Sequence, residues 1–161
     1  MSDEVPMTIK GLMLDPVANS PIVVLKDDDD STYLPIWVGI FEANAIALEL
    51  ESVETPRPMT HDLLKTVLSS LEAVVTRIVI DSLRENTFYA KIYLDFDSRS
   101  LTIDSRPSDA IALALRAKAP IFVARAVLDE ARTIKPEQAS EDSVKKWLEQ
   151  MRPEDFGKYE M

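Results

Sequence analysis

Carboxylate, arginine and histidine side chains gather at the predicted starts of the helices. An Arg-Pro pair followed by a helix-capping residue and an aspartate occurs twice, at 57–62 and at 106–109. Arginine can hold phosphate oxygens through two hydrogen bonds, and carboxylates can bind hard cations such as Mg²⁺ or Mn²⁺. Together these groups could activate water against a phosphodiester. The candidate residues are Glu42, Arg57, His61, Asp62, Asp104, Arg106, Ser108 and Asp109.

Each residue type suggests a role. His61 is the only histidine in the chain and therefore the natural general acid or base. The candidate catalytic carboxylates are Asp62, Asp109 and Glu42. The residues expected to contact the substrate are Arg57, Arg106 and Ser108. The expected ligands of a divalent metal ion are Asp104, Asp109 and Glu42.

The same residues also have a structural interpretation. Asp62 and Asp109 suit the positive end of a helix dipole, and Ser108 can cap a helix. Either arginine can pair with a nearby carboxylate to fix a turn. The sequence therefore leaves two functions open: a metal-assisted phosphodiesterase, and a non-enzymatic dimeric binding or regulatory module whose Arg-Pro turns are structural.

A second candidate surface lies on the predicted strand 87–96. Tyr89, Lys91 and Tyr93 alternate with apolar residues, so they share one face of the strand. Aromatic and basic side chains at this spacing can stack on bases and contact phosphates. The alternative is an amphipathic strand face that a helix or a second subunit covers.

The composition limits the partners and the compartment. The formal net charge of −10 argues against broad electrostatic binding of nucleic acid, so we expect a nucleic-acid substrate to bind without strong affinity. The absence of cysteine excludes disulfides and thiolate metal sites. No P-loop or dinucleotide fingerprint is present, so we expect no nucleotide or organic cofactor. No apolar run is long enough for a membrane span and no leader is visible, so we expect a cytoplasmic protein.

Hydrophobic periodicity predicts an α+β fold: an antiparallel or mixed sheet with a β-meander, three packed helices and a C-terminal helical tail. The predicted strands are 5–14 with a bulge at Gly11, 22–25, 32–38 with Pro35 favouring an edge, 77–83, 87–96, 101–104 and 120–123. The predicted helices are 42–51, 60–74 with Thr60 as cap, one that starts at Ser108, and a turn or two at 126–131. No residue from Ala110 to Leu115 is polar, so that helix should be sandwiched between the sheet and another element.

Two parts of the chain are predicted. Residues 1–134 should form one domain, and 135–161 a linker followed by an amphipathic helical tail. The apolar stripe of this tail consists of Val144, Trp147, Leu148 and Met151. It should dock on its own domain or on a partner subunit.

Several motifs together resemble one family. They are LPIWVG at 34–39 with Glu42-Ala43, RPMTHDLL at 57–64, FYA at 88–90 and RPSDAIAL at 106–113. In this order, over residues 5–133, they resemble the bifunctional nuclease domain of bacteria and plants. The resemblance implies an α+β fold, a homodimer and activity on both DNA and RNA, but it carries over no catalytic mechanism. The matching positions include Glu42, Arg57, His61, Asp62, Arg106, Ser108 and Asp109.

Overall fold

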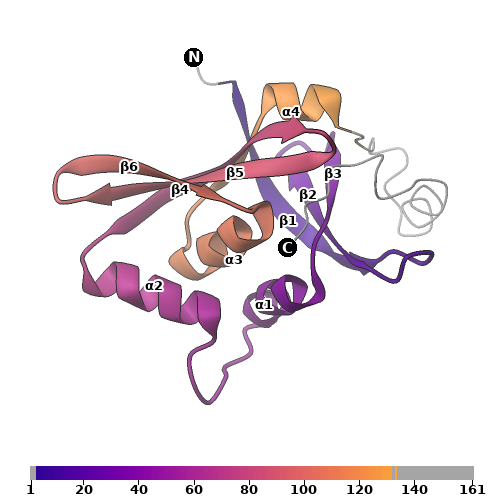
Figure 1. The fold of residues 1–161 in the computed structure, drawn as a ribbon. Coiled ribbons are helices and arrows are strands. Elements are labelled where there is room, and N and C mark those ends of the chain that lie inside the picture. Colours follow the sequence, from indigo (N-terminus) through magenta and orange to yellow (C-terminus); the bar gives the residue numbers. More distant parts are fainter. Residues whose placement is uncertain (1–2, 132, 134–161) are drawn as a thin grey trace.

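The computed structural model describes residues 3–131 and 133, which form the predicted α+β fold around one seven-stranded mixed sheet (Figure 1). The strands are β1 (Glu4–Leu14), β2 (Pro21–Asp27), β3 (Tyr33–Trp37), β4 (Val74–Arg84), β5 (Thr87–Phe96), β6 (Arg99–Ser105) and β7 (Ile121–Ala124). The helices are α1 (Ile40–Leu50), α2 (Thr60–Ser70), α3 (Pro107–Ala117) and the short α4 (Arg125–Glu130).

One short strand joins two antiparallel meanders into a single sheet. The strand order is β3-β2-β1-β7-β4-β5-β6. β7 pairs with β1 antiparallel and with β4 parallel, and the other neighbours are antiparallel. Ile121 of β7 lies opposite Met7 on one side and Ile78 on the other. Because these three side chains are buried, β7 connects the cores of the two meanders.

Most predicted elements are confirmed, with differences at their ends. The irregularity in β1 falls between Ile9 and Gly11, and β3, which contains Pro35, is an edge strand, as predicted. The helix predicted over 60–74 with Thr60 as cap has Met59 as its N-cap instead, and it ends at Ser70. The β-branched residues that begin β4 pair with β5, and this pairing ends the helix early.

Helix α3 occupies the centre of the fold. Ala110, Ile111, Ala112 and Leu113 are at most 1% exposed. On one side α3 packs against β4 and β5, and on the other side against α1 and α2 (Figure 1). The predicted sandwich is therefore confirmed, and the core holds the start of α3 in a fixed position beside α1 and α2.

The remaining helix lies on the other side of the sheet. Figure 1 shows α4 opposite α1–α3, where it packs on β4 and β7. Among the described residues, no helix has the length and apolar character needed to cross a membrane. The predicted tail helix lies outside the described residues, and the division into 1–134 and 135–161 stays a prediction.

Candidate functional site

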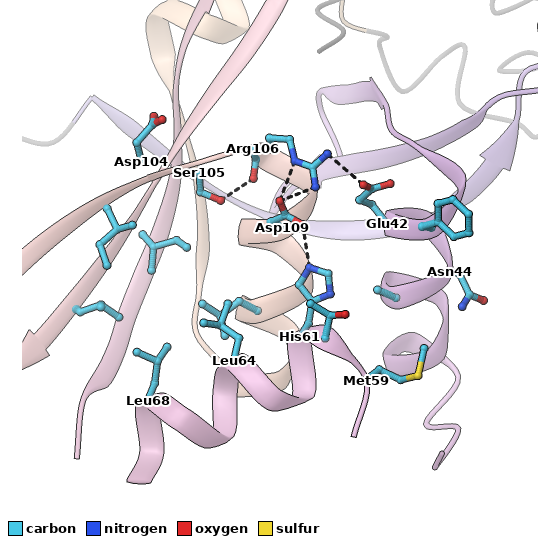
Figure 2. A pocket seen from close by; sticks show the side chains of 17 residues that line it. Glu42, Asn44, Met59, His61, Leu64, Leu68, Asp104, Ser105, Arg106 and Asp109 are labelled. Atoms are coloured by element: carbon cyan, nitrogen blue, oxygen red, sulfur yellow. Dashed lines mark hydrogen bonds and ion pairs between the residues drawn. The ribbon is translucent and has the colours of Figure 1, made fainter. Parts of the chain in front are cut away.

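A cavity of about 880 Å³ opens where α1, α2 and the start of α3 face strands β5 and β6. Leucine and isoleucine side chains of α2, β5, β6 and α3 form an apolar wall (Figure 2). Hydrogen-bonding side chains stand together at one end. This polar cluster consists of Glu42, His61, Arg106 and Asp109.

The polar cluster is one connected network centred on Asp109. His61 Nε2 lies 2.9 Å from Asp109 Oδ1. Arg106 Nε and Nη2 each lie 2.8 Å from Asp109 Oδ2, and Arg106 Nη1 lies 3.1 Å from Glu42 Oε1. The network therefore joins three helices, because Glu42 comes from α1, His61 from α2, and the other two from the start of α3.

The start of α3 brings Arg106 and Asp109 together. Arg106 is the N-cap, with extended backbone angles of φ −70° and ψ 145°, and Pro107 takes the first helical position, which suits its fixed φ and missing N–H. Asp109 follows Arg106 by three residues, so the two side chains lie on the same side of the first turn. Ser108, predicted to cap this helix and to contact substrate, is instead a helical residue that is fully buried and does not line the cavity.

The charge on Asp109 determines which group donates in its hydrogen bond with His61. Burial alone raises the pKa of Asp109, but hydrogen bonds from His61 and Arg106 outweigh it and hold the pKa below the ordinary value of 3.8. Asp109 is therefore an anion at neutral pH, so His61 Nε2 donates the proton in their hydrogen bond. The lone pair of the neutral ring is then on Nδ1, which is the nitrogen that can accept a proton.

Glu42 is a buried carboxylate with one unused oxygen. Only 7% of the residue is exposed, although it lines the cavity. Its Oε1 accepts a hydrogen bond from Arg106, whereas its Oε2 is buried and has no hydrogen-bond partner among the described residues. Leaving a buried carboxylate oxygen without a donor costs stability. Glu42 lines the cavity, so a hydrogen-bond donor that binds there could pair with this oxygen after a small rotation of the side chain.

Asp62, one of the predicted catalytic carboxylates, does not line the cavity. Its Oδ1 accepts a hydrogen bond of 2.6 Å from Arg116 Nε, and its Oδ2 one of 3.0 Å from the Met59 N–H. The Met59 and Arg116 hydrogen bonds lower the pKa of Asp62. Arg116 also donates to the carbonyls of Ala112 and Ala45. Asp62 thus belongs to a largely buried connection that ties α2 to α1 and α3.

Two further predicted residues stay apart from the polar cluster. Arg57 is exposed and does not line the cavity. Asp104 lies at the edge of the cavity. Side chains alternate along β6, so the Asp104 side chain stands on the sheet face opposite to that of Ile103, on the same face as its strand partner Lys91. Figure 2 shows the Asp104 carboxylate pointing away from the polar cluster.

Tyr89, Lys91 and Tyr93 share one face of β5, as predicted, but that face is turned away from the cavity. The cavity is lined by the alternating residues Ile92 and Leu94. Each of the three predicted contact residues meets a charged side chain of β4. These partners are Arg84, whose guanidinium lies 4.6 Å from the Tyr89 ring centroid, Asp81, 3.6 Å from Lys91 Nζ, and Arg77, 3.9 Å from the Tyr93 ring centroid.

The three predicted metal ligands do not form a ready-made ion site. Glu42 and Asp109 both bind Arg106, and Asp104 points away from them. Over residues 3–131 and 133, no group of three or more His, Cys, Asp or Glu side chains is placed to hold a metal ion. Metal assistance therefore stays a prediction.

Sequence reasoning missed two residues of this region. Phe41 lines the cavity beside Glu42 with 79% of its surface exposed. The sequence could have indicated Phe41, because it is an aromatic residue outside the buried stripe that Ala43 and Ile46 form in the same helix. Arg116 was also missed. A lone arginine that ends a long apolar run needs carboxylate or carbonyl partners in the interior.

Comparison with known proteins gives one family and two groups of relatives. Residues 23–136 match the bifunctional nuclease domain. The chain is 36% identical over 159 residues to an uncharacterized protein of Mycobacterium tuberculosis, covering 92% of this chain and 95% of that protein. It is 30% identical over 125 residues to bifunctional nuclease 2 of Oryza sativa subsp. japonica, covering 74% of this chain and 38% of the rice protein. Bifunctional nuclease 2 of Arabidopsis thaliana is 28% identical over 108 residues, which cover 65% of this chain and 33% of the plant protein.

Proposed function

The chain belongs to the bifunctional nuclease domain family, and from this premise we propose that it is a nuclease that hydrolyses phosphodiester bonds in DNA and RNA without sequence preference. The two plant relatives named bifunctional nucleases support the proposal. The observation that carries it is the hydrogen-bonded arrangement of His61, Asp109 and Arg106 at one end of a cavity of nucleotide size.

In this proposal His61 is the general base. Asp109 accepts the Nε2–H hydrogen bond and fixes the ring, while Nδ1 takes a proton from water. The water oxygen bonds to phosphorus as the bond from phosphorus to the leaving sugar oxygen breaks. Solvent water protonates that oxygen, and the imidazolium releases its proton to solvent. Water is the nucleophile, so DNA and RNA can both react.

Arg106 is proposed to position the phosphate. Its side chain is 34% exposed and lines the cavity, where a guanidinium can bind phosphate oxygens. Its carboxylate partners hold its orientation but offset much of its charge. With a net charge of −10 on the whole chain, substrate binding should be weak and should weaken further as salt rises.

Cleavage of labelled single-stranded DNA and RNA by the purified protein tests the proposal. We expect His61→Ala to lower the rate by about 100-fold or more, because general acid–base catalysis is lost. Asp97→Asn in the exposed turn between β5 and β6 is the control and should keep full activity. Unchanged cleavage by folded His61→Ala, or activity that leaves the protein on further chromatography, would contradict the proposal. Added EDTA tests the predicted metal assistance in the same assay. A metal requirement should show weak, roughly millimolar affinity, because the part of the chain that the structure describes offers no ready-made ion site.

The second candidate is the non-enzymatic dimeric module. It is favoured by the pairing within the polar cluster, which could simply lock α1, α2 and α3 together. It is also favoured by α2, which has no buried residue. Two of its residues and its C-cap form an exposed stripe with four-residue spacing: Leu63, Val67 and Leu71. We propose that a second copy of the chain covers this stripe in a homodimer, whichever of the two functions holds.

The homodimer is tested by light scattering after gel filtration. Leu63→Lys combined with Val67→Glu should convert the dimer to a monomer, because charges would replace apolar contacts. Val17→Lys changes an equally exposed valine in the turn between β1 and β2 and should leave the dimer intact. Dimers in both variants would place the interface elsewhere. If Arg106→Ala dissociates the dimer and the wild type cleaves no nucleic acid, the regulatory module is the better account.

A further inference from the structure

We propose that the cavity takes one unpaired nucleobase, with Glu42 Oε2 accepting a hydrogen bond from the N–H donor on its Watson–Crick edge. This inference rests on the proposed nuclease function, which it deepens by naming the substrate class as single-stranded nucleic acid. It comes from Glu42 Oε2 and Phe41, which the hydrolysis step does not use.

The unused oxygen of Glu42 calls for a donor. The Glu42 side chain is 9% exposed, and its Oε2 has no hydrogen-bond partner in the part of the chain that the structure describes. Arg106, the nearest cation in the cluster, already contacts Oε1 and the carboxylate of Asp109. The two carboxylates thus outnumber the guanidinium, so this corner suits an N–H donor better than a second phosphate.

The surroundings of Glu42 suit a flat and largely apolar group. The cavity wall is formed by aliphatic side chains, among them Leu64, Leu68 and Ile92. Phe41 stands at the cavity with most of its ring exposed, in a position to stack on a base. A volume of about 880 Å³ is ample for a base and its sugar.

The donor requirement explains selection for single strands without selection for sequence. Every nucleobase carries an N–H donor on its Watson–Crick edge, and in a duplex that donor is already hydrogen-bonded to the opposite base. A duplex must therefore unpair and unstack a base before Glu42 can accept from it. An unpaired base of any kind meets the requirement directly.

The test measures binding of nucleosides, which contain no phosphodiester bond, by NMR titration of the ¹⁵N-labelled protein. The probes are uridine, 5-methyluridine and 3-methyluridine. The last lacks the N3–H donor, whereas 5-methyluridine carries the same added methyl group elsewhere and keeps the donor. We expect 3-methyluridine to bind about tenfold more weakly than the other two, because a buried carboxylate oxygen stays unpaired.

Variants of Glu42 and Phe41 test which residue causes the difference in nucleoside affinity. Glu42→Gln keeps the shape but can place an amide donor where Oε2 accepts, so the difference between the two methylated nucleosides should disappear. Glu51→Gln, a change of the same kind in the exposed residue that ends α1, should keep the difference. Phe41→Ala should weaken the binding of all three nucleosides by similar factors, because stacking does not depend on the N3 position.

The outcomes separate this inference from the proposed function. Tenfold discrimination without cleavage of any nucleic acid supports the base site and contradicts the nuclease. Cleavage of single-stranded and duplex DNA at equal rates, with equal binding of the three nucleosides or none, overturns the base site and leaves the nuclease standing. If Glu42→Gln does not fold, the comparison of the two methylated nucleosides on the wild type decides alone.

Discussion

The two Arg-Pro turns look alike in sequence and are used differently in the structure. Both lead into a helix, and in both the aspartate is the third helical residue, Asp62 in α2 and Asp109 in α3. In the second turn the arginine is the N-cap and pairs with Asp109. In the first turn Met59 is the N-cap, and Arg57 lies two residues further out, where it is exposed.

The difference shows that distance from the helix start matters more than the motif. An arginine three residues before an aspartate sits one helical turn away on the same side, whereas Arg57 is five residues before Asp62. The two turns nevertheless meet, because His61 of the first turn contacts Asp109 of the second at 2.9 Å. They therefore share the cavity through His61 and not through Arg57 or Asp62.

The largest effect is expected on the cleavage rate, which should depend on Arg106 and not on Arg57. Arg106→Ala should lower the rate of cleavage by about 100-fold, because the guanidinium that positions phosphate and orients Asp109 is lost. Arg57→Ala removes the same charge from the other turn and should stay within about twofold of the wild type, as an exposed substitution should. Initial rates on single-stranded DNA at fixed salt concentration measure both.

Folding must be controlled in this comparison, because Arg106→Ala leaves two carboxylates without their guanidinium. The double variant Arg106→Ala/Asp109→Asn removes one of those charges and should still be inactive when thermal unfolding shows it to be folded. Full activity in this folded double variant would remove the polar cluster from the proposed site. Equal losses of cleavage rate in Arg106→Ala and Arg57→Ala would show that the two Arg-Pro turns do not differ in function.

Elements with strong local patterns could be predicted from the sequence. Alternating residues gave the β4–β5 hairpin, and the apolar run from Ala110 to Leu115 gave the central helix. Side-chain partners could not be predicted in the same way, because they are distant in the chain. Asp62 finds Arg116 at a separation of 54 residues, and His61 finds Asp109 at a separation of 48.

The direction of each candidate side chain was also beyond local reasoning. Asp62 and Asp109 occupy equal helical positions, and only the packing of α2 against α3 decides which of them reaches the cavity. Alternation correctly placed Tyr89, Lys91 and Tyr93 on one strand face, but it cannot tell which face of the sheet the helices cover. The burial of Glu42 depends on α1 packing against α3, which no local pattern reports.

A smaller effect is expected on stability. It concerns Arg116, the partner of Asp62, whereas Asp109 is paired with Arg106. Arg116→Met should lower the free energy of unfolding by about 2–3 kcal/mol, because it leaves the Ala45 carbonyl and Asp62 Oδ1 without the donor that Arg116 supplies. Asp62 is one-third exposed, so water compensates part of the loss. Urea unfolding measures the change, with Arg125→Met on the exposed start of α4 as control. A loss no larger than in the control would show that α2 does not depend on Arg116.

The smallest effect concerns protein stability at low pH. Asp62 and Asp109 should contribute to stability in the same way as pH falls, although only Asp109 should be needed for cleavage. Both carboxyl groups have a pKa below the ordinary value of 3.8 in the folded protein. Their ionised forms therefore stabilise the fold fully above the unfolded-state pKa of about 4, and this contribution is lost as pH falls through the lowered pKa.

Asp62→Asn and Asp109→Asn should each be less stable than the wild type near neutral pH, and both differences should narrow as pH falls below about 4. Urea midpoints between neutral pH and about pH 3 measure this narrowing. At neutral pH, Asp109→Asn should lose cleavage because His61 loses its anionic partner, whereas folded Asp62→Asn should keep it. Differences that widen in acid would refute the lowered pKa values. Equal loss of cleavage in both variants, after correction for the folded fraction, would mean that the two turns do not differ in function.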